Sequence, residues 1–237
     1  TQDSSSAASD VYKRQDQRVA EAITTSGQLS IRWIEKEINK YLNGLLKPEE
    51  TKDYVVAVDT DSVYIRMDDL VKKVFGEKIE DKTKVIDFLD KVCEEKLEDI
   101  IEKSYVHLAD YINAFQQKMV MKRENIADRA VWTAKKRYIM NVFDSEGVRY
   151  EEPQLKIMGI EAIRSSTPAA CKIKMKDIFK IIMNGTEDDA INYIEEFKEE
   201  FSTLEAEDIF FPRSVRGLDK YYDSAQLYKK GTPIHVK

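Results

Sequence analysis

The hydrophobic positions of this chain repeat with a helical period over two long stretches. Over residues 18–46 the apolar side chains recur every three or four positions, which predicts an amphipathic helix. The same period runs over residues 84–114 and predicts a helix about 45 Å long, at roughly 1.5 Å per residue. We expect this helix to pack across the back of a sheet, and pairing with a partner helix in a coiled coil is the alternative. A shorter helix is expected over 68–75, because Gly76 follows it.

Between the first two helices the pattern changes to one typical of strands. Two runs of β-branched and aromatic residues flank a pair of aspartates, so residues 53–67 are predicted to form a strand, a tight turn and a second strand. Asp59 and Asp61 lie two positions apart, which in a strand places both side chains on one side of the backbone. The flanking runs are Val55, Val56 and Val58, then Val63, Tyr64 and Ile65.

Residues 117–158 are predicted to contain further strands, with a hairpin turn at 144–147. The predicted fold class is therefore α+β, in which a small, mostly antiparallel sheet carries Asp59 and Asp61 and is backed by the two long helices. The predicted strands are Met119–Met121, Val131–Thr133, Tyr138–Phe143 and Pro153–Met158.

The chain after about residue 164 is predicted to be helical. Thr167 and Pro168 have the pattern of a helix start, with Thr as the N-cap and Pro at the first helical position. Gly185 ends that helix and Thr186 caps the next one. After residue 206 the apolar period is lost, which indicates surface loops.

The composition is that of a soluble globular protein. The 237 residues are 42% apolar and 35% charged, enough for one large domain or two small ones, and no apolar run reaches the length of a membrane span. Cys93 and Cys171 lie on apolar helix faces, so we expect buried thiols in a reducing compartment such as the cytoplasm. Residues 1–15 are rich in Ser and Ala, resemble a translated adapter sequence, and are expected to be a disordered or non-native leader.

The charge is unevenly distributed along the chain. The net charge of −6 argues mildly against a nucleic-acid binder. However, the charged residues of 117–138 are mostly basic and those of 187–208 are mostly acidic. A chain that separates its charges in this way can present one surface to an anion.

Asp59 and Asp61 are the candidate chemical site. Two carboxylates presented together suit a hard cation such as Mg²⁺, which takes oxygen ligands and leaves room for substrate phosphates. This suggests two-metal phosphoryl or nucleotidyl transfer. A turn without metal fits the local pattern equally well. A glycosyltransferase that holds a metal and a nucleotide-sugar diphosphate at its Asp-x-Asp is a further alternative. A calcium EF-hand is excluded, because Val63 and Tyr64 occupy its third ligand position and its glycine position.

Five stretches of the sequence resemble family B DNA polymerases, in the same order and with similar spacing from about residue 16 to the end of the chain. Asp59-Thr60-Asp61-Ser62 is similar to the aspartate motif of the palm. The others are Ala22–Gln28, similar to the helix that enters the palm; Ala134–Tyr138, similar to a Lys-Lys-x-Tyr strand along the primer; and Leu155–Gly159 with Ser165–Pro168, similar to the palm-to-thumb junction of T-even-type phage polymerases.

The resemblance implies a role for each matching residue. Asp59 and Asp61 would be catalytic carboxylates that hold Mg²⁺, with Mn²⁺ as a substitute, and Thr60 and Ser62 would lie at the nucleotide. Glu124 matches an acidic palm residue, for which an ordinary salt bridge to Arg123 or Arg129 is the alternative. The residues expected to bind DNA are Lys135, Lys136, Arg137, Tyr138 and Lys156.

This sequence departs from the family pattern in two ways. Ala57 and Val58 stand where Tyr-Gly is usual, and Lys122 stands where phage relatives often have Asp. The upstream Asp-x-x-Ser-Leu-Tyr-Pro-like motif, the fingers helix and the exonuclease domain have no counterpart here. The resemblance therefore implies a fragment with the C-terminal part of the palm over 16–163 and an incomplete thumb over 164–237.

The function expected from the resemblance is template-directed DNA synthesis by a larger enzyme, with this fragment inactive by itself. Its partners would be primer–template DNA, a dNTP and, in the full-length protein, a sliding clamp, with no membrane. The setting would be the host cytoplasm if a phage encodes the protein. A non-catalytic nucleic-acid-binding module is the second alternative to a polymerase, beside the glycosyltransferase.

Overall fold

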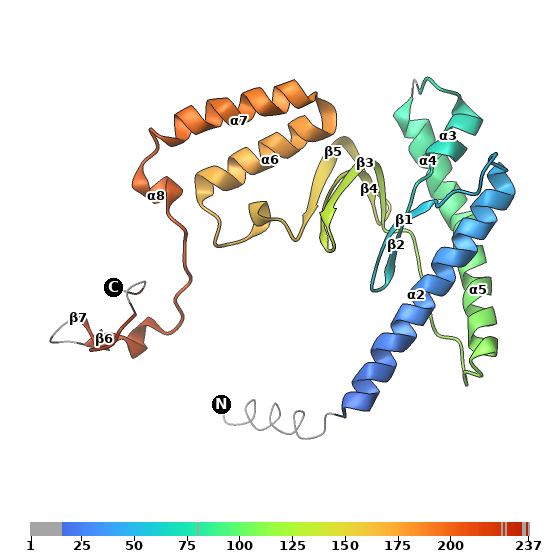
Figure 1. Ribbon diagram of the computed structural model, residues 1–237, viewed down its shortest axis with the longest axis horizontal. Helices are drawn as coiled ribbons and strands as arrows, with labels where there is room; N and C mark the ends of the chain where they lie inside the picture. The colour runs from blue at the N-terminus through green and yellow to red at the C-terminus, as the bar shows by residue number, and fades with distance from the viewer. Residues whose placement is uncertain (1–15, 80, 224, 226, 234–235, 237) are drawn as a thin grey trace. The chain divides into compact units, whose positions relative to one another are not determined.

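The computed structural model describes residues 16–79, 81–223, 225, 227–233 and 236. The leader expected at residues 1–15 lies outside these. The chain forms two compact units, Thr1–Ile126 and Ala127–Lys237 (Figure 1). The predicted α+β class is confirmed, because each unit combines helices with a small antiparallel sheet.

The first unit begins with the long helix α2, Gln17–Leu46, close to the predicted bounds. Asp16 caps its N-terminus by accepting a hydrogen bond from the Arg18 N–H, and Lys47 ends it in a left-handed conformation. An antiparallel hairpin follows, in which β1, Val55–Asp59, pairs with β2, Ser62–Ile65. The hairpin predicted over 53–67 is thereby confirmed.

The predicted helix over 84–114 is nearly continuous but contains a change of winding. Helix α3, Asp68–Phe75, comes first and ends before Gly76 as expected. The long helix then runs through α4, Lys82–Val92, and α5, Glu98–Tyr111, and the two are joined by a π-helical turn at Cys93–Leu97. A π turn accommodates an extra residue without ending the helix, so the apolar stripe continues across it.

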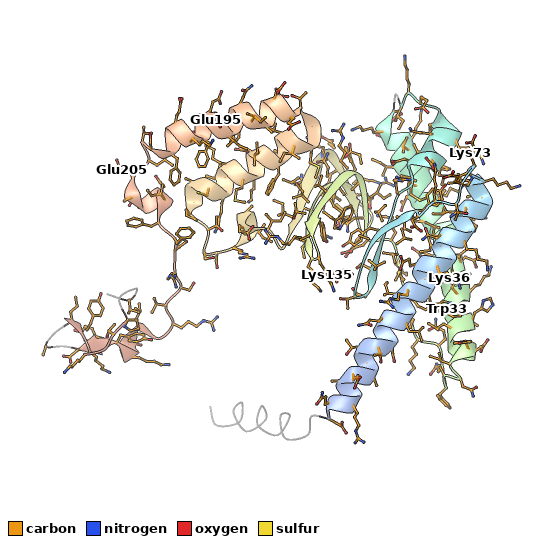
Figure 2. All side chains as sticks on the ribbon, in the orientation of Figure 1. Trp33, Lys36, Lys73, Lys135, Glu195 and Glu205 are labelled. Atoms are coloured by element: carbon orange, nitrogen blue, oxygen red, sulfur yellow. The ribbon has the colours of Figure 1, made fainter. Side chains whose placement is uncertain are left out.

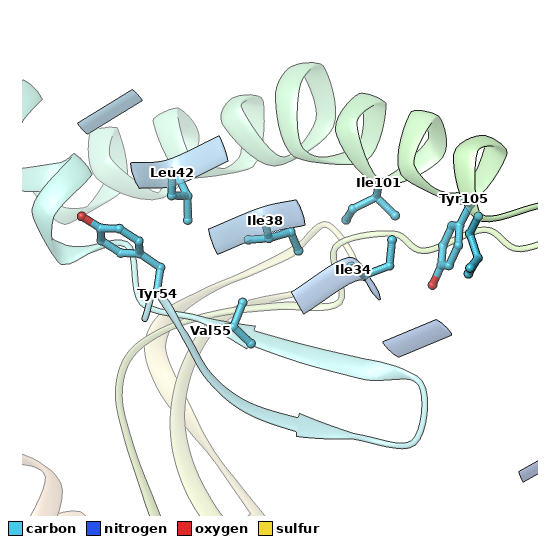
Figure 3. Close-up of a cluster of buried hydrophobic side chains, with 8 residues drawn as sticks. Ile34, Ile38, Leu42, Tyr54, Val55, Ile101 and Tyr105 are labelled. Carbon is cyan, nitrogen blue, oxygen red and sulfur yellow. The ribbon is translucent and has the colours of Figure 1, made fainter. Parts of the chain in front are cut away.

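The core of the first unit lies between α2, α5 and the start of β1. Ile34, Ile38 and Leu42 of α2 meet Ile101 of α5, and all four side chains are buried (Figure 3). The remaining members are Tyr54, Val55, Tyr105 and Leu108. Helix α2 therefore backs the hairpin as expected, and α5 packs against α2 (Figure 1).

The second unit is built on a separate three-stranded antiparallel sheet in the order β3-β4-β5. Its strands are β3, Asn125–Ala134; β4, Arg137–Ser145; and β5, Val148–Met158. Seven consecutive residues of the central strand β4 are buried. The predicted turn is confirmed at Glu146-Gly147, where both residues have positive φ as a two-residue hairpin of type I′ requires.

Helices complete the second unit. A 3₁₀ turn at Glu161–Ile163 is followed by α6, Ala169–Asn184, and α7, Glu187–Phe201, which pack against each other. Short elements follow: α8, Ala206–Ile209; a 3₁₀ turn at Leu218–Lys220; β6, Tyr222–Asp223; and β7, Leu227–Tyr228. No helix among the described residues is both long and apolar enough to cross a membrane.

Several local predictions are wrong, and three of them concern the elements described so far. The single sheet is replaced by separate sheets, because the aspartate hairpin pairs only with itself among the described residues. Met119–Met121 is not a strand. Thr167 does not cap α6, because its hydroxyl donates to the carbonyl of Glu161 (2.6 Å) and Pro168 takes the N-cap position.

Candidate functional site

The two predicted site aspartates lie at the tip of the β1–β2 hairpin. Asp59 is the last residue of β1 and pairs with Ser62, the first residue of β2, so Thr60 and Asp61 form a two-residue loop. Thr60 has a φ of 44°. Tight hairpins place positive φ at this position, but a β-branched residue rarely adopts it, so the tip is a strained turn.

The loop changes the geometry expected for the two carboxylates. Strand alternation extends only as far as Asp59, because the chain turns at Thr60 and Asp61 lies in the loop. Asp59 is half-buried, whereas Asp61 is exposed. Both carboxylates are still brought to one hairpin tip, which is the feature that the sequence predicted.

The two residues expected at the nucleotide, Thr60 and Ser62, contact the aspartates. The Thr60 hydroxyl donates to Oδ1 of Asp59 (3.0 Å), and the Ser62 hydroxyl lies 3.5 Å from Oδ1 of Asp61. A carboxylate has two oxygens that can each accept more than one bond, so a hydroxyl contact does not by itself prevent the carboxylate from holding a cation.

The donor set at the hairpin tip fits Mg²⁺ in part. Mg²⁺ is commonly held by one or two carboxylates together with waters and substrate phosphates. Asp59 and Asp61 supply such a pair of hard oxygen donors. Across the described part of the chain, no three His, Cys, Asp or Glu side chains form a group that could hold a metal, so Glu124 does not complete a cluster with the two aspartates.

The side chain of Asn39 on α2 holds the segment that leads into β1. Its Oδ1 accepts hydrogen bonds from the backbone N–H groups of Tyr54 (2.7 Å) and Val55 (3.0 Å). Asn43, one helical turn later, bonds the backbone of Lys52. Neither asparagine could be predicted as part of the site, because neither belongs to a recognisable sequence motif.

Glu124 is exposed and lies just before β3. Its neighbour Arg123 is 12% exposed and pairs with Asp90 (2.8 Å), and its N–H donates to Oε1 of Glu98 (3.2 Å). These contacts fasten residues 122–124 to the long helix at its π turn. Arg129, the other alternative partner, donates to the Met183 carbonyl in the second unit.

Cys93, at the start of the π turn, has an unreactive thiol. Burial, together with the nearby carboxylates of Asp90 and Glu98, raises the pKa of its thiol to about 11, against the opposing effect of Arg123. A thiol with this pKa stays protonated near neutral pH and is a poor nucleophile. Cys93 and Cys171 are both free and half-buried, so the prediction of buried thiols is met only in part.

The basic residues expected at DNA lie at one end of the second unit's sheet. Lys135 and Lys136 form the exposed turn between β3 and β4, at the edge of the sheet marked by Lys135 in Figure 2. The expectation that they lie in a strand is wrong, because the chain turns there and Lys136 has a φ of 61°. Lys156 lies on β5, opposite Met140.

Arg137 and Tyr138 begin β4 and have protein partners. Arg137 pairs with Glu161 (2.5 Å), and its guanidinium holds the pKa of that carboxyl below its usual range. Tyr138 is 6% exposed and packs against Trp132, with ring centroids 5.9 Å apart. The two lysines are therefore the more accessible members of this basic group.

Comparisons with known proteins agree with the motif order. The chain is 40% identical over 184 residues to the DNA-directed DNA polymerase of Escherichia phage RB69, and 34% identical over 234 residues to that of Enterobacteria phage T4. These alignments cover 74% and 95% of this chain but only 20% and 26% of the two relatives, so the chain spans about a quarter or less of their length.

The sequence model of divergent family B DNA polymerases matches residues 44–213. This range includes the aspartate hairpin, the basic turn and both helices α6 and α7. The match removes the glycosyltransferase alternative, because that alternative had only the Asp-x-Asp turn in its favour. The chain belongs to the divergent family B DNA polymerases.

Proposed function

We propose that this chain forms part of the catalytic centre of a DNA-directed DNA polymerase. The observation that carries the proposal is the hairpin tip at residues 59–62, which presents two carboxylates in a chain of this family. In the full-length enzyme the primer 3′-oxygen would attack the α-phosphate of a dNTP, and pyrophosphate would leave. Primer–template DNA and a dNTP are thus the proposed substrates.

Asp59 and Asp61 are the proposed ligands of Mg²⁺, with Mn²⁺ as a substitute. When bound, the cation supplies positive charge to the reacting phosphate. The part of this chain is to hold the two carboxylates at a fixed tip, where Thr60 orients Oδ1 of Asp59 through its hydroxyl. Thr60 and Ser62 are the proposed neighbours of the nucleotide.

The basic residues are the proposed contacts to the primer strand. Lys135, Lys136 and Lys156 supply point charges to phosphates, and Arg137 and Tyr138 support the same end of the sheet through Glu161 and Trp132. In family terms, residues 16–163 would belong to the palm and 164–237 to the thumb. Glu124 would be an acidic palm residue.

The remaining parts of the proposal concern the larger enzyme. Synthesis is expected to need segments that are not among these 237 residues, so the chain by itself is proposed to be inactive. A sliding clamp would be a partner of the full-length protein, and the host cytoplasm would be its place of action.

A Mn²⁺ titration of the isotopically labelled chain tests the metal assignment. Paramagnetic broadening should begin at the backbone amides of residues 59–62, and Asp59→Asn combined with Asp61→Asn should remove it. Asp99→Asn combined with Asp110→Asn is the matched control, because it removes the same charge from exposed positions of α5. Equal broadening in both double variants would show that the hairpin is only a turn and leave the nucleic-acid-binding module as the better description.

A further inference from the structure

Two asparagine side chains on one face of α2 make hydrogen bonds to the backbone of residues 52–55, in the place that a neighbouring strand would take. Asn39 and Asn43 are four residues apart, so their side chains project from neighbouring turns of the helix. Asn43 pairs with Lys52 as a strand would: its Oδ1 accepts the Lys52 N–H (2.9 Å) and its Nδ2 donates to the Lys52 carbonyl (2.8 Å). A third Asn43 bond, from Nδ2 to the Asn39 carbonyl (2.8 Å), fixes the side chain on the helix.

Asn39 holds the next part of the same segment. Its Oδ1 accepts from two consecutive backbone amides, Tyr54 (2.7 Å) and Val55 (3.0 Å), and its Nδ2 lies 3.4 Å from Oδ1 of Asp53. Consecutive N–H groups of a regular strand point in opposite directions, so two bonds to one acceptor require an irregular backbone. Asn39 therefore stabilises a backbone conformation that an unperturbed strand does not have.

The irregularity coincides with a break in the β1–β2 register. Val55 pairs with Ile65 and Ala57 with Tyr64, so the pairing shifts between Val55 and Ala57. Tyr54 and Val55 are adjacent yet both buried, at 1% and 6% exposure, which strict alternation does not allow. The bulge lets both side chains enter the core while the rest of β1 alternates.

The bulge sets which way the side chains of β1 point as far as the site. Beyond it, Val56 and Val58 are 48% and 38% exposed, whereas Ala57 and Asp59 are half-buried. A slip of one residue in a strand exchanges its two faces, so it would move Asp59 to the face now held by Val58. The hydrogen bonds from Asn39 are made at this bulge, four to five residues before Asp59, where the register of β1 is set.

We propose that Asn39 is a positioning residue, which fixes the bulge before β1 and thereby the face on which Asp59 presents its carboxylate. Asn43 anchors the same segment one step earlier, at Lys52. The proposal rests on the proposed function in so far as Asp59 is a metal ligand. Its structural part, control of the hairpin register by a side chain on α2, stands independently of the metal.

The test uses the 237-residue chain, labelled with ¹⁵N and ¹³C, in wild-type form and in three variants. Asn39→Leu has a similar size but no acceptor. Asn39→Asp combined with Asp53→Asn keeps the acceptor for the two amides and exchanges the amide–carboxylate pair. Ile101→Val trims the same hydrophobic core, and so destabilises the unit while keeping every hydrogen bond that Asn39 and Asn43 make.

Two measurements are made on each protein. Cross-strand NOEs report whether Val58 lies opposite Val63 and Asp59 opposite Ser62, as in the structure. Mn²⁺ broadening of the Asp59 and Asp61 amides reports the metal. In Asn39→Leu we expect the wild-type NOEs to disappear or shift by one residue, and the Mn²⁺ midpoint to rise about tenfold or more, which is the usual loss when a group that orients a ligand is removed.

The exchanged pair should restore both the NOEs and the Mn²⁺ midpoint, and Ile101→Val should change neither although its melting temperature falls. Wild-type NOEs and metal midpoint in a folded Asn39→Leu would overturn the proposal. If Asn39→Leu does not fold, the variant Asn39→Asp with Asp53→Asn provides the test. The proposal is overturned if that variant folds but lacks the wild-type NOEs. Absence of Mn²⁺ broadening in the wild-type chain contradicts only the proposed metal binding. The role of Asn39 in setting the hairpin register is still tested by the NOEs.

Discussion

Gly159 lies so close to Lys136 that a Cβ at position 159 would be 2.1 Å from the Lys136 carbonyl oxygen. Gly159 follows β5 and has a φ of 66°, so it is a glycine for two reasons: the backbone conformation and the close approach. The contact ties the end of β5 to the basic turn between β3 and β4. The shape of the turn that presents Lys135 and Lys136 therefore depends on a glycine more than twenty positions away.

Positive φ alone costs an L-residue about 1 kcal/mol. We expect Gly159→Ala to lower the free energy of unfolding by clearly more than this. Gly147→Ala is the matched control, because Gly147 also has positive φ (87°) but has no atom within 4 Å of the added Cβ. Urea unfolding of both variants measures the difference. Equal losses in the two variants would show that the contact with Lys136 does not constrain the turn.

Replacing Arg123 tests the attachment of residues 122–124 to the long helix. Arg123→Met should destabilise the chain by about 1–3 kcal/mol, because Asp90 would lose its guanidinium partner in a partly desolvated place. Lys103→Met is the control: Lys103 and Asp99 are both more than half exposed, so its loss should cost at most about 0.5 kcal/mol. Similar melting temperatures for the two variants would contradict this expectation.

The start and end of most elements could be predicted from local signals in the sequence. Helix α3 ends before Gly76 and the β4–β5 turn contains Gly147, because glycine marks the backbone conformation that each place needs. Thr60 and Lys136 have positive φ as well, but nothing in their residue type shows it. The strand expected at Lys135–Lys136 was therefore wrong, while the turn at Glu146-Gly147 was right.

The candidate site was predictable only where its parts are adjacent in the sequence. Asp59 and Asp61 are visible as a motif between two β-branched runs. The partners of Asn39 are 15 and 16 positions away, and an isolated asparagine in a helix has no periodic pattern to reveal them. The π turn that begins at Cys93 could not be predicted either, because the apolar stripe of the long helix continues through it without a break.

The ion pair between Lys52 and Asp69 should make stability depend on pH in the acid range. The Lys52 ammonium, 2.7 Å away, is the largest of the causes that hold the pKa of Asp69 below its ordinary value of 3.8. A carboxyl whose pKa is lower in the folded state stabilises the fold above the unfolded-state pKa, and this contribution is lost as the pH falls through the folded-state pKa. The contribution should therefore be complete near neutral pH and be lost progressively as the pH falls below 3.8.

Lys52→Gln tests this cause directly. We expect the pKa of Asp69 in the variant to move up toward 3.8, because the Tyr54 hydroxyl, 3.3 Å away, is a weaker partner than the ammonium. An NMR titration of the Asp69 carboxyl measures it, with urea unfolding across the same pH range. An unchanged Asp69 titration in Lys52→Gln would contradict the assignment of the shift to Lys52.

DNA binding by the basic turn should be weak and should fall steeply with salt, because each neutralised phosphate releases counterions. Lys135→Ala combined with Lys136→Ala should weaken binding of a primer–template duplex and flatten its dependence on salt. Lys36→Ala combined with Lys40→Ala on α2 removes the same charge elsewhere and is the control. Fluorescence anisotropy at several salt concentrations distinguishes the two variants, and identical slopes would argue against a role of the turn at the primer.

The sharpest prediction concerns Asp59 in a full-length polymerase that contains this chain. Asp59→Ala should lower single-turnover incorporation by at least about a hundredfold while DNA affinity stays close to that of the wild-type enzyme. The physical reason is a separation of tasks: phosphate contacts spread over a large surface hold the DNA, whereas the two carboxylates act where charge develops in the transition state. Asp61→Ala should also be severe, with partial recovery in Mn²⁺.

Thr60→Ala is the control within the same turn. The Thr60 hydroxyl donates to Oδ1 of Asp59, so its loss should slow incorporation far less than loss of either carboxylate. Incorporation and DNA binding are measured side by side for the three variants. If Asp59→Ala incorporates nucleotides at nearly the wild-type rate, the two carboxylates do not hold the catalytic metal, and the strained tip at Thr60 serves only to turn the chain.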